Sequence, residues 1–148
     1  MNDLAVNKRA RFDYEILETY EAGMELRGFE VKAVKSGRMS LAGAFVVIRG
    51  NEAWLLGAAI PPYQAANTPA KYEPERTRRL LLKKSEIREL IGKTAQKGLT
   101  LVPLKVYTKR SRVKMLIGLA RHKKQHDKRE TIKKRESRRE IARDIQRG

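Results

Sequence analysis

Alternation of apolar and polar residues is the main pattern of the first 120 residues, and it predicts β-strands. Residues 12–20 ("FDYEILETY") largely alternate and are rich in strand-forming side chains. Residues 43–59 contain two apolar runs on either side of "RGNE", and residues 98–120 contain two more around "KRSR". Gly50 and Asn51 can adopt the positive φ of a tight turn. These stretches therefore predict one further strand and two β-hairpins.

Two short segments have helical spacing instead. Residues 28–37 ("GFEVKAVKSG") place two valines three positions apart before a glycine, which predicts one or two helical turns. Residues 84–92 ("KSEIRELIG") have two glutamates near the start and isoleucine and leucine on one face. Ser85 is the expected N-cap and Gly92 the expected stop, so this segment is predicted as a helix of two turns.

Prolines mark the irregular parts of the chain. Four of the five lie within residues 61–79, which predicts a loop or an edge excursion. The stretch "RRLLLKK" (78–84) after it fits a buried strand or the run-in to the next helix. Pro103 cannot donate a ladder hydrogen bond, so we expect it at an edge or a bulge. Five or six short strands with small helices between them indicate a mainly β fold, a small antiparallel barrel or sandwich.

Positive charge is unevenly distributed along the chain, and its excess indicates a polyanionic ligand. The 148 residues include 34 Lys and Arg against 17 Asp and Glu, a net charge of +17. Residues 121–148 hold 12 basic and 5 acidic residues, so this tail carries +7 and the body, residues 1–120, carries +10. A domain this basic is typical of proteins that bind RNA or DNA. The tail has too few apolar residues to fold alone, so we expect it to be disordered when free.

Within the body, basic residues gather in three places beside apolar ones, and these could line one electropositive face. They lie before Phe12, before Leu80 and around the last predicted turn, and the third group consists of Lys109, Arg110, Arg112 and Lys114.

Several classes of function and location are disfavoured. The chain has no cysteine, which excludes disulfides, thiol catalysis and cysteine-bound zinc and fits a reducing compartment. We recognise no signal peptide and no run of apolar residues long enough for a membrane span, so we expect a cytoplasmic protein without membrane contact. No nucleotide-binding or hydrolase motif is present, so we expect no enzyme activity and no cofactor.

His122 and His126 are four residues apart, a spacing that could place both rings on one helical face. Neighbouring lysines and the scarcity of further ligands argue against a metal site. Solvated histidines, or a role in stacking or phosphate contact, are the remaining interpretations. Asp127 and Glu130 resemble a capping box, so the tail is expected to become helical when an anionic surface neutralises it.

The order and spacing of longer motifs resemble the small protein B family, the SsrA-binding proteins. The motifs are "NKRARFDYEI", "YEAGMELRGFEVKAVKSGR", "RTRRLLLKKSEI", "KGLTLVPLKVY" and "VKMLIGLARHKKQHDKRE". This resemblance implies an OB-fold-like antiparallel β-barrel with about three short helices. It implies binding to the tRNA-like domain of tmRNA and delivery of alanyl-tmRNA to ribosomes stalled on non-stop mRNA. It also implies a tail that becomes helical in the mRNA entry channel next to the decoding centre of 16S rRNA, with elongation factor Tu in the delivery complex and a monomeric protein.

The same resemblance assigns roles to residues. Glu21 of "YEAG", Leu81 of "RRLLL" and Lys114 of "VKM" match positions that support tmRNA binding. Lys114 can meet phosphate, Leu81 can pack against unstacked bases, and Glu21 can accept from a base edge, a 2′-OH or a neighbouring basic residue. Further tmRNA-binding candidates are Asn7, Lys8, Arg9, Lys32, Lys35 and Arg78. The candidate ribosome-binding residues of the tail are Lys123, Lys124, His126, Asp127, Lys128, Arg129, Lys133, Lys134, Arg135 and Ile145.

One residue departs from the family pattern, and two other function classes stay open. Many relatives have glycine where this chain has His122, which bears on where the tail bends. A basic ribosomal or ribosome-assembly protein would share the composition. An RNA-modifying enzyme would need a cofactor cleft, for which the sequence offers no motif.

Overall fold

The computed structural model describes residues 2–124, 129, 132 and 135, and its core is one antiparallel sheet of seven strands. The strands are β1 (Asp3–Val6), β2 (Tyr14–Met24), β3 (Phe45–Arg49), β4 (Glu52–Leu56), β5 (Arg78–Leu81), β6 (Leu99–Lys109) and β7 (Arg112–His122). The helices are α1 (Ala10–Asp13), α2 (Gly28–Lys35) and α3 (Lys84–Thr94), with a 3₁₀ turn, η1 (Ala65–Asn67).

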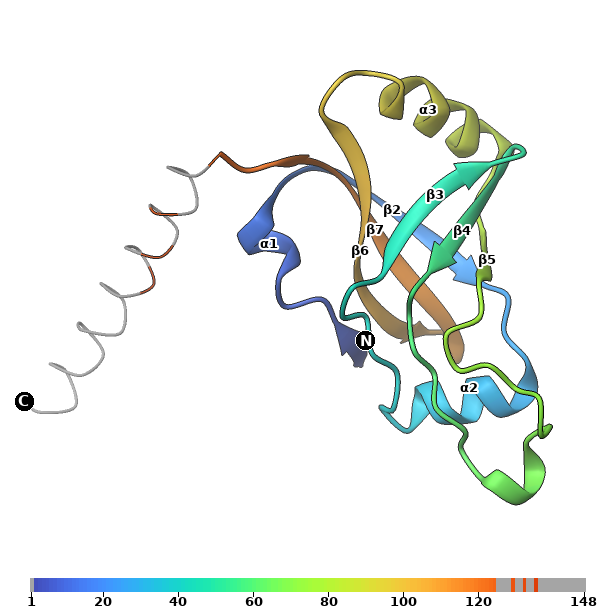
Figure 1. The fold of residues 1–148 in the computed structure, drawn as a ribbon. Helices are drawn as coiled ribbons and strands as arrows, with labels where there is room; N and C mark the ends of the chain where they lie inside the picture. Colours follow the sequence, from blue (N-terminus) through green and yellow to red (C-terminus); the bar gives the residue numbers. More distant parts are fainter. Residues whose placement is uncertain (1, 125–128, 130–131, 133–134, 136–148) are drawn as a thin grey trace, which may run out of the picture.

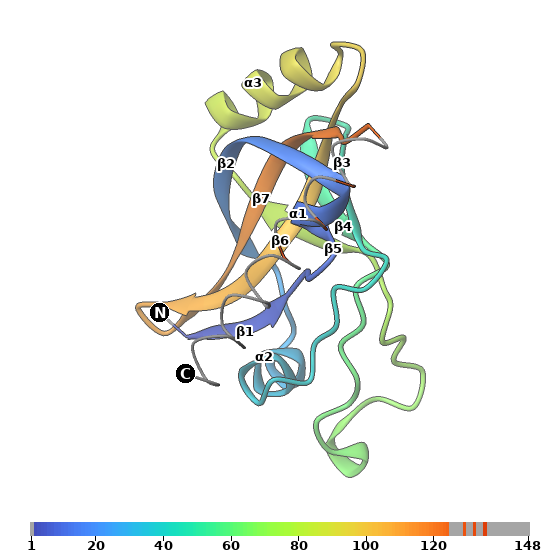
Figure 2. The same cartoon turned by 90° about the vertical axis from the view of Figure 1, so that its left-hand side faces the viewer.

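The sheet has the strand order β1-β6-β7-β2-β5-β4-β3 and curls until β3 packs against β6. Figure 1 shows α3 over one end of this curved sheet and α2 at the other, with the loop that carries η1 beyond α2. Figure 2 shows β1 beside β6 at the rim. The expectation of a mainly β, barrel-like fold with about three short helices is confirmed.

The interior of the barrel is apolar and continuous. Leu55, Leu80, Met115 and Ile117 line it from three different strands and have 0–1% of their surface exposed. Leu90 of α3 joins the same cluster and closes one end. Burial of these side chains is the main source of stability for a domain of this size.

Both predicted hairpins are present, and their turn residues explain them. Gly50 and Asn51 have φ of 61° and 58° between β3 and β4, and Arg110 and Ser111 have φ of 51° and 67° between β6 and β7. Two consecutive residues with positive φ match the right-handed twist of the flanking strands. Glycine and asparagine adopt this conformation easily, whereas Arg110 does so at some cost.

Pro103 lies at a bulge, as expected for a proline inside a sheet. The pairing of β6 with β7 shifts register between Pro103 and Lys105. Asn7 fills the gap that the bulge leaves, because its backbone N–H donates to Leu104 O (2.8 Å) and its side-chain amide donates to Pro103 O (2.8 Å). The segment after β1 is therefore tied to the bulge.

Three local predictions were wrong in detail. Residues 12–13 belong to α1, so the strand begins at Tyr14, and it continues to Met24 instead of ending at residue 20. Helix α3 is capped by Lys83, whose N–H donates to the Glu86 carboxylate (3.1 Å), and not by Ser85. Gly92 lies inside α3 and does not end it. "RRLLLKK" combines both alternatives, since β5 leads directly into α3.

A buried ion pair fixes the proline-rich loop, residues 61–77, to α2. The side chains of Arg78 and Glu30 have no exposed surface, and Arg78 donates to Glu30 Oε2 from Nε (3.0 Å) and Nη2 (2.7 Å). Arg76 donates to both oxygens of the same carboxylate. The Tyr72 hydroxyl lies 3.1 Å from Glu30 Oε2 and accepts from Arg78. Every group in this cluster therefore has a partner, as burial of charge requires.

This arrangement corrects one prediction and sets the charge of Glu30. Arg78 was expected at the RNA-binding surface, but its side chain is buried and committed to Glu30 and to Ala58 O (2.8 Å). Burial alone would raise the pKa of Glu30, but hydrogen bonds from Arg76, the backbone N–H of Arg27 and Arg78 lower it to about 2. Glu30 is therefore ionised throughout the physiological range.

Candidate nucleic-acid interface

Strand pairing brings Glu21, Leu81 and Lys114 together, although they are far apart in the sequence. Strand β2 lies between β7 and β5, and Gly23 of β2 pairs with Lys114 on one side and with Leu81 on the other. Glu21 lies two residues from Gly23 on the same strand, so its side chain is on the same face. The three positions assigned through the family motifs thus form one group on the outside of the barrel.

Gly23 keeps the centre of this group open. A Cβ at Gly23 would lie 3.3 Å from the Cβ of Leu81, which is closer than most side chains pack. Leu81 is 45% exposed, so nearly half of its surface faces solvent. Together with Met24, Leu26 and Val31 it lines a hollow of about 290 Å³. Such an exposed apolar surface can receive an unstacked base.

A larger, basic hollow of about 600 Å³ adjoins it at the turn of the β6–β7 hairpin. It is lined by Glu21, Lys109, Arg110, Arg112 and Lys114, so four cations face one carboxylate. Arg112 and Lys114 also line the apolar hollow, which makes the two continuous. An excess of positive charge beside an apolar surface is suited to phosphate and base contact at one place.

Glu21 is held in a defined position within this positive field. The Tyr107 hydroxyl donates to its Oε2 (2.5 Å), and Lys109 Nζ lies 3.3 Å from its Oε1. The hydrogen bond from Tyr107 lowers the pKa of Glu21, partly opposed by burial and reinforced by Lys109. Burial and the hydrogen bond to Glu21 raise the pKa of Tyr107. Glu21 is therefore an ionised acceptor with oriented lone pairs.

The other body candidates lie in three different surroundings. Lys35 donates to Ser111 O (3.0 Å), so it is beside the basic hollow. Asn7, Lys8 and Arg9 line a separate hollow near the start of the chain, where the Asn7 amide is committed to the bulge of β6. Lys32 lines a third pocket, between α2 and the proline-rich loop. The structure does not gather these residues into one site.

The start of the tail is attached to α1. Strand β7 continues to His122, whose ring packs on Tyr14 with a centroid distance of 4.3 Å. Lys123 then donates from its backbone N–H to Asp13 O (2.9 Å) and from its side chain to Arg11 O (2.8 Å). The chain is thus fixed on leaving the barrel.

The structure describes only part of the predicted tail site. Lys124, Arg129 and Arg135 are exposed, and the Arg135 guanidinium lies 5.7 Å from the centre of the Phe12 ring. The remaining tail candidates lie outside the described residues; they are His126, Asp127, Lys128, Lys133, Lys134 and Ile145. The predicted capping box of Asp127 and Glu130 also lies outside them.

Sequence reasoning missed Tyr107 and Gly23, as well as the apolar lining of the hollow beside Leu81. Tyr107 lies two residues from both Lys105 and Lys109 along β6. Only the fold shows that its hydroxyl reaches Glu21. Gly23 belongs to the quoted "YEAG" motif and could have been identified as a point of close approach between strands. In the described part of the chain, no three acidic or histidine side chains are grouped to hold a metal ion. Among those same residues, no helix is long and apolar enough to cross a membrane.

Comparison with known proteins agrees with this geometry. The family model described as SmpB protein matches residues 4–147. The chain belongs to the SmpB family. It is 55% identical over 141 residues to an SsrA-binding protein of Gloeothece citriformis, covering 95% of this chain and 91% of that one. It is 53% identical over 140 residues to an SsrA-binding protein of Thermosynechococcus vestitus, covering 95% and 92%.

A solved structure extends the SmpB comparison to the fold. A chain in the structure described as "tmRNA-SmpB: a journey to the center of the bacterial ribosome" matches with a TM-score of 0.66 and 47% identity. The match covers 86% of this chain and 92% of that one. Family membership disfavours the alternative of a ribosomal or ribosome-assembly protein.

Proposed function

We propose that this protein is an RNA-binding adaptor for ribosome rescue, which binds the tRNA-like domain of tmRNA. The observation that carries the proposal is the row Lys114–Gly23–Leu81 across three adjacent strands. Glu21 lies beside this row in a hollow that four basic side chains line. The match to proteins named SsrA-binding supports the choice of RNA.

Each part of this interface has a distinct task. The cations at the β6–β7 turn attract the RNA backbone and set the salt dependence of binding. Leu81 and the apolar hollow receive a base that has left its stack. Glu21 repels phosphate, so its oriented oxygens favour a base edge or a 2′-hydroxyl and thereby discriminate among RNAs.

The body and the tail have separate roles in this proposal. The body, residues 1–120, binds tmRNA, and the basic tail, residues 121–148, becomes helical in the empty mRNA channel beside the decoding centre of 16S rRNA. His126 stacks on an rRNA base, and Ile145 makes an apolar contact further along the channel. The protein acts as a cytoplasmic monomer, joins elongation factor Tu in delivering alanyl-tmRNA and catalyses no reaction itself.

Competitive binding tests the RNA assignment. We expect sub-micromolar affinity for the tRNA-like domain of tmRNA, with a steep decrease as salt rises. An unrelated hairpin of equal length should bind far more weakly at the same ionic strength. Equal affinity for the two RNAs would remove the basis of the proposal.

Truncation after Lys124 tests the division of labour. The shortened chain keeps the described hydrogen bonds of the barrel and of Lys123, so it should bind the tRNA-like domain almost as tightly as the full chain. It should not support peptide tagging on stalled ribosomes. Tagging at the normal rate by the shortened chain would show that the tail only adds electrostatic attraction.

A further inference from the structure

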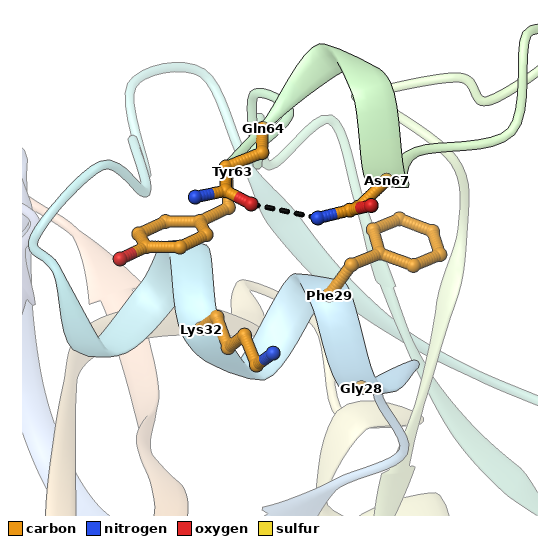
Figure 3. Close-up of a pocket in the computed structure, with 6 residues that line it drawn as sticks. All are labelled: Gly28, Phe29, Lys32, Tyr63, Gln64 and Asn67. Carbon is orange, nitrogen blue, oxygen red and sulfur yellow. Dashed lines mark hydrogen bonds between the residues drawn. The ribbon is translucent and has the colours of Figure 1, made fainter.

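The pocket that Lys32 lines is separate from the interface described above and lies between α2 and the proline-rich loop. It has a volume of about 370 Å³, and its lining consists of Gly28, Phe29, Lys32, Tyr63, Gln64 and Asn67. Figure 3 shows the rings of Tyr63 and Phe29 at its two ends, with the amides of Gln64 and Asn67 and the side chain of Lys32 between them. This volume falls within the usual range for small-ligand pockets, about 300–1,000 Å³.

The lining has the groups that recognise a nucleotide. Two aromatic rings offer flat surfaces on which a base can stack. Asn67 Nδ2 donates to Gln64 Oε1 (2.7 Å), and among the described residues neither Gln64 Nε2 nor Asn67 Oδ1 has another hydrogen bond. The amide nitrogen of Gln64 and the amide oxygen of Asn67 therefore remain as donor and acceptor groups for a base edge. Lys32 adds a cation for phosphate, and the lining contains no carboxylate among the described residues.

The aromatic rings are held in place before any ligand arrives. Arg38 donates to Tyr63 O (3.0 Å), and its guanidinium lies 5.4 Å from the centre of the Tyr63 ring. Phe29 packs edge-on against Tyr72 with a centroid distance of 4.8 Å. Tyr63 nevertheless keeps 36% of its surface exposed. A site whose rings are already ordered loses little conformational entropy on binding.

The buried ion pair holds the loop that carries half of this pocket. Tyr72, Arg76 and Arg78 all lie in the loop or at its end, and all three contact Glu30 of α2. Residues 61–77 form a long connection with only the short turn η1, and loops of this length in a compact domain are uncommon and are either functional or linker segments. A buried charge cluster is a costly way to stabilise a fold but an effective way to fix a loop in one position.

We infer that this pocket binds one unstacked nucleotide of a structured RNA, with its base between Tyr63 and Phe29 and its phosphate near Lys32. The inference rests on the proposed function, because it takes RNA to be the ligand. It adds a contact on α2 and the loop that is independent of Glu21, Leu81 and Lys114. The nucleotide belongs to tmRNA or to ribosomal RNA, and both sources present the same chemistry.

Chemical probing at single-nucleotide resolution tests the inference, with full-length tmRNA and stalled ribosomes as separate RNA targets. The full chain should protect one base that Tyr63→Ser exposes again on one of the two targets, with affinity for that target reduced roughly 5- to 150-fold. Tyr63→Phe keeps the ring and should restore the protection. Asn67→Ala should reduce the same protection without altering the ring.

The remaining footprint separates the two proposals. Protections that depend on Lys114 should be unchanged in Tyr63→Ser, and its thermal midpoint should stay close to that of the parent because Tyr63 is at the surface. If Tyr63→Ser leaves both footprints identical to those of the unmodified protein, the pocket inference is overturned. If the unmodified protein protects no specific bases on tmRNA, the proposed function itself fails.

Discussion

Two glutamates of this protein each lie beside a tyrosine hydroxyl and basic side chains, but one is buried and the other is open to solvent. Glu30 has a tyrosine hydroxyl and two arginines around it, and no part of its side chain is exposed. Glu21 has a tyrosine hydroxyl and Lys109, and its side chain is 35% exposed among further cations. The first cluster is closed and its charges are paired internally, whereas the second is open and has an excess of positive charge.

The choice of cation accounts for the difference. Arginine presents a planar fork that satisfies a carboxylate in two directions, which suits a buried site where no water can replace a missing bond. Lysine is a flexible point charge that remains hydrated and can leave its partner for a phosphate. The cluster at Glu30 therefore maintains the fold, and the cluster at Glu21 is available to a ligand.

The strongest way to break this comparison is the same substitution at both sites. Glu30→Gln should lower the free energy of unfolding by about 3–5 kcal/mol, because two arginines lose the charge that balances them. Glu21→Gln should lower it by less than about 1 kcal/mol, since its partners are exposed or keep an acceptor. Urea denaturation measures both values. Equal losses would show that burial does not distinguish the two clusters.

The pH dependence of the free energy of unfolding gives a second test of the buried cluster. The pKa of Glu30 is about 2 in the folded protein and 4.5 without the fold, so the contribution of its charge is complete above pH 4.5 and disappears as pH falls towards 2. The loss is roughly 3 kcal/mol. Unfolding measured from pH 6 to pH 2 should show this decrease in the parent protein but not in Glu30→Gln. A parallel decrease in the variant would assign the acid sensitivity to other groups.

Removal of positive charge from the open cluster should weaken RNA binding with little effect on folding. The double variant Arg112→Ala with Lys114→Ala should reduce the slope of log affinity against log salt for tmRNA by about two, one for each phosphate that is no longer neutralised. Its unfolding free energy should change by less than about 0.5 kcal/mol for each cation removed from the surface. Lys84→Ala with Lys97→Ala is the matched control at and after α3, and it should leave the slope unchanged.

The smallest expected effect concerns the glycine between the cations and the apolar hollow. Gly23→Val should displace Leu81 and weaken tmRNA binding roughly fivefold, a part of one base contact of about 1–3 kcal/mol. Gly92→Ala is the control, because a Cβ there meets no atom within 4 Å. It should stabilise α3 by about 0.5–1 kcal/mol and leave RNA binding unchanged. Equal RNA affinity of Gly23→Val and the parent would separate Leu81 from the interface.

Local patterns were sufficient for some elements and insufficient for others. The hairpins followed from alternating runs around residues that accept positive φ, such as Gly50 and Asn51. Strand β1 and helix α1 have only four residues each, and their positions depend on β6 and β7. No local rule detects such segments, because their stability comes from residues about a hundred positions away in the sequence.

Charge was the least predictable property of individual residues. Arg78 stands in a run of basic residues and was expected at the surface, yet its partner Glu30 lies 48 positions earlier in a short helix. Glu21, Leu81 and Lys114 were assigned from family motifs, but their proximity follows from the order β7-β2-β5, which no periodicity indicates. Motifs identified residues, and only strand order showed which of them meet.

Strand β7 has a mechanical consequence, because it carries Lys114 near one end and His122 at the other. It is paired along most of this length with β6 on one side and with β2 on the other, so it cannot bend independently. Eight residue steps at about 3.3 Å make it a rod of roughly 26 Å. A ligand that binds Lys114 is therefore held at a fixed distance and direction from His122, where the chain leaves the barrel. Binding of a ligand at the Lys114 end of β7 therefore orients the segment that follows His122.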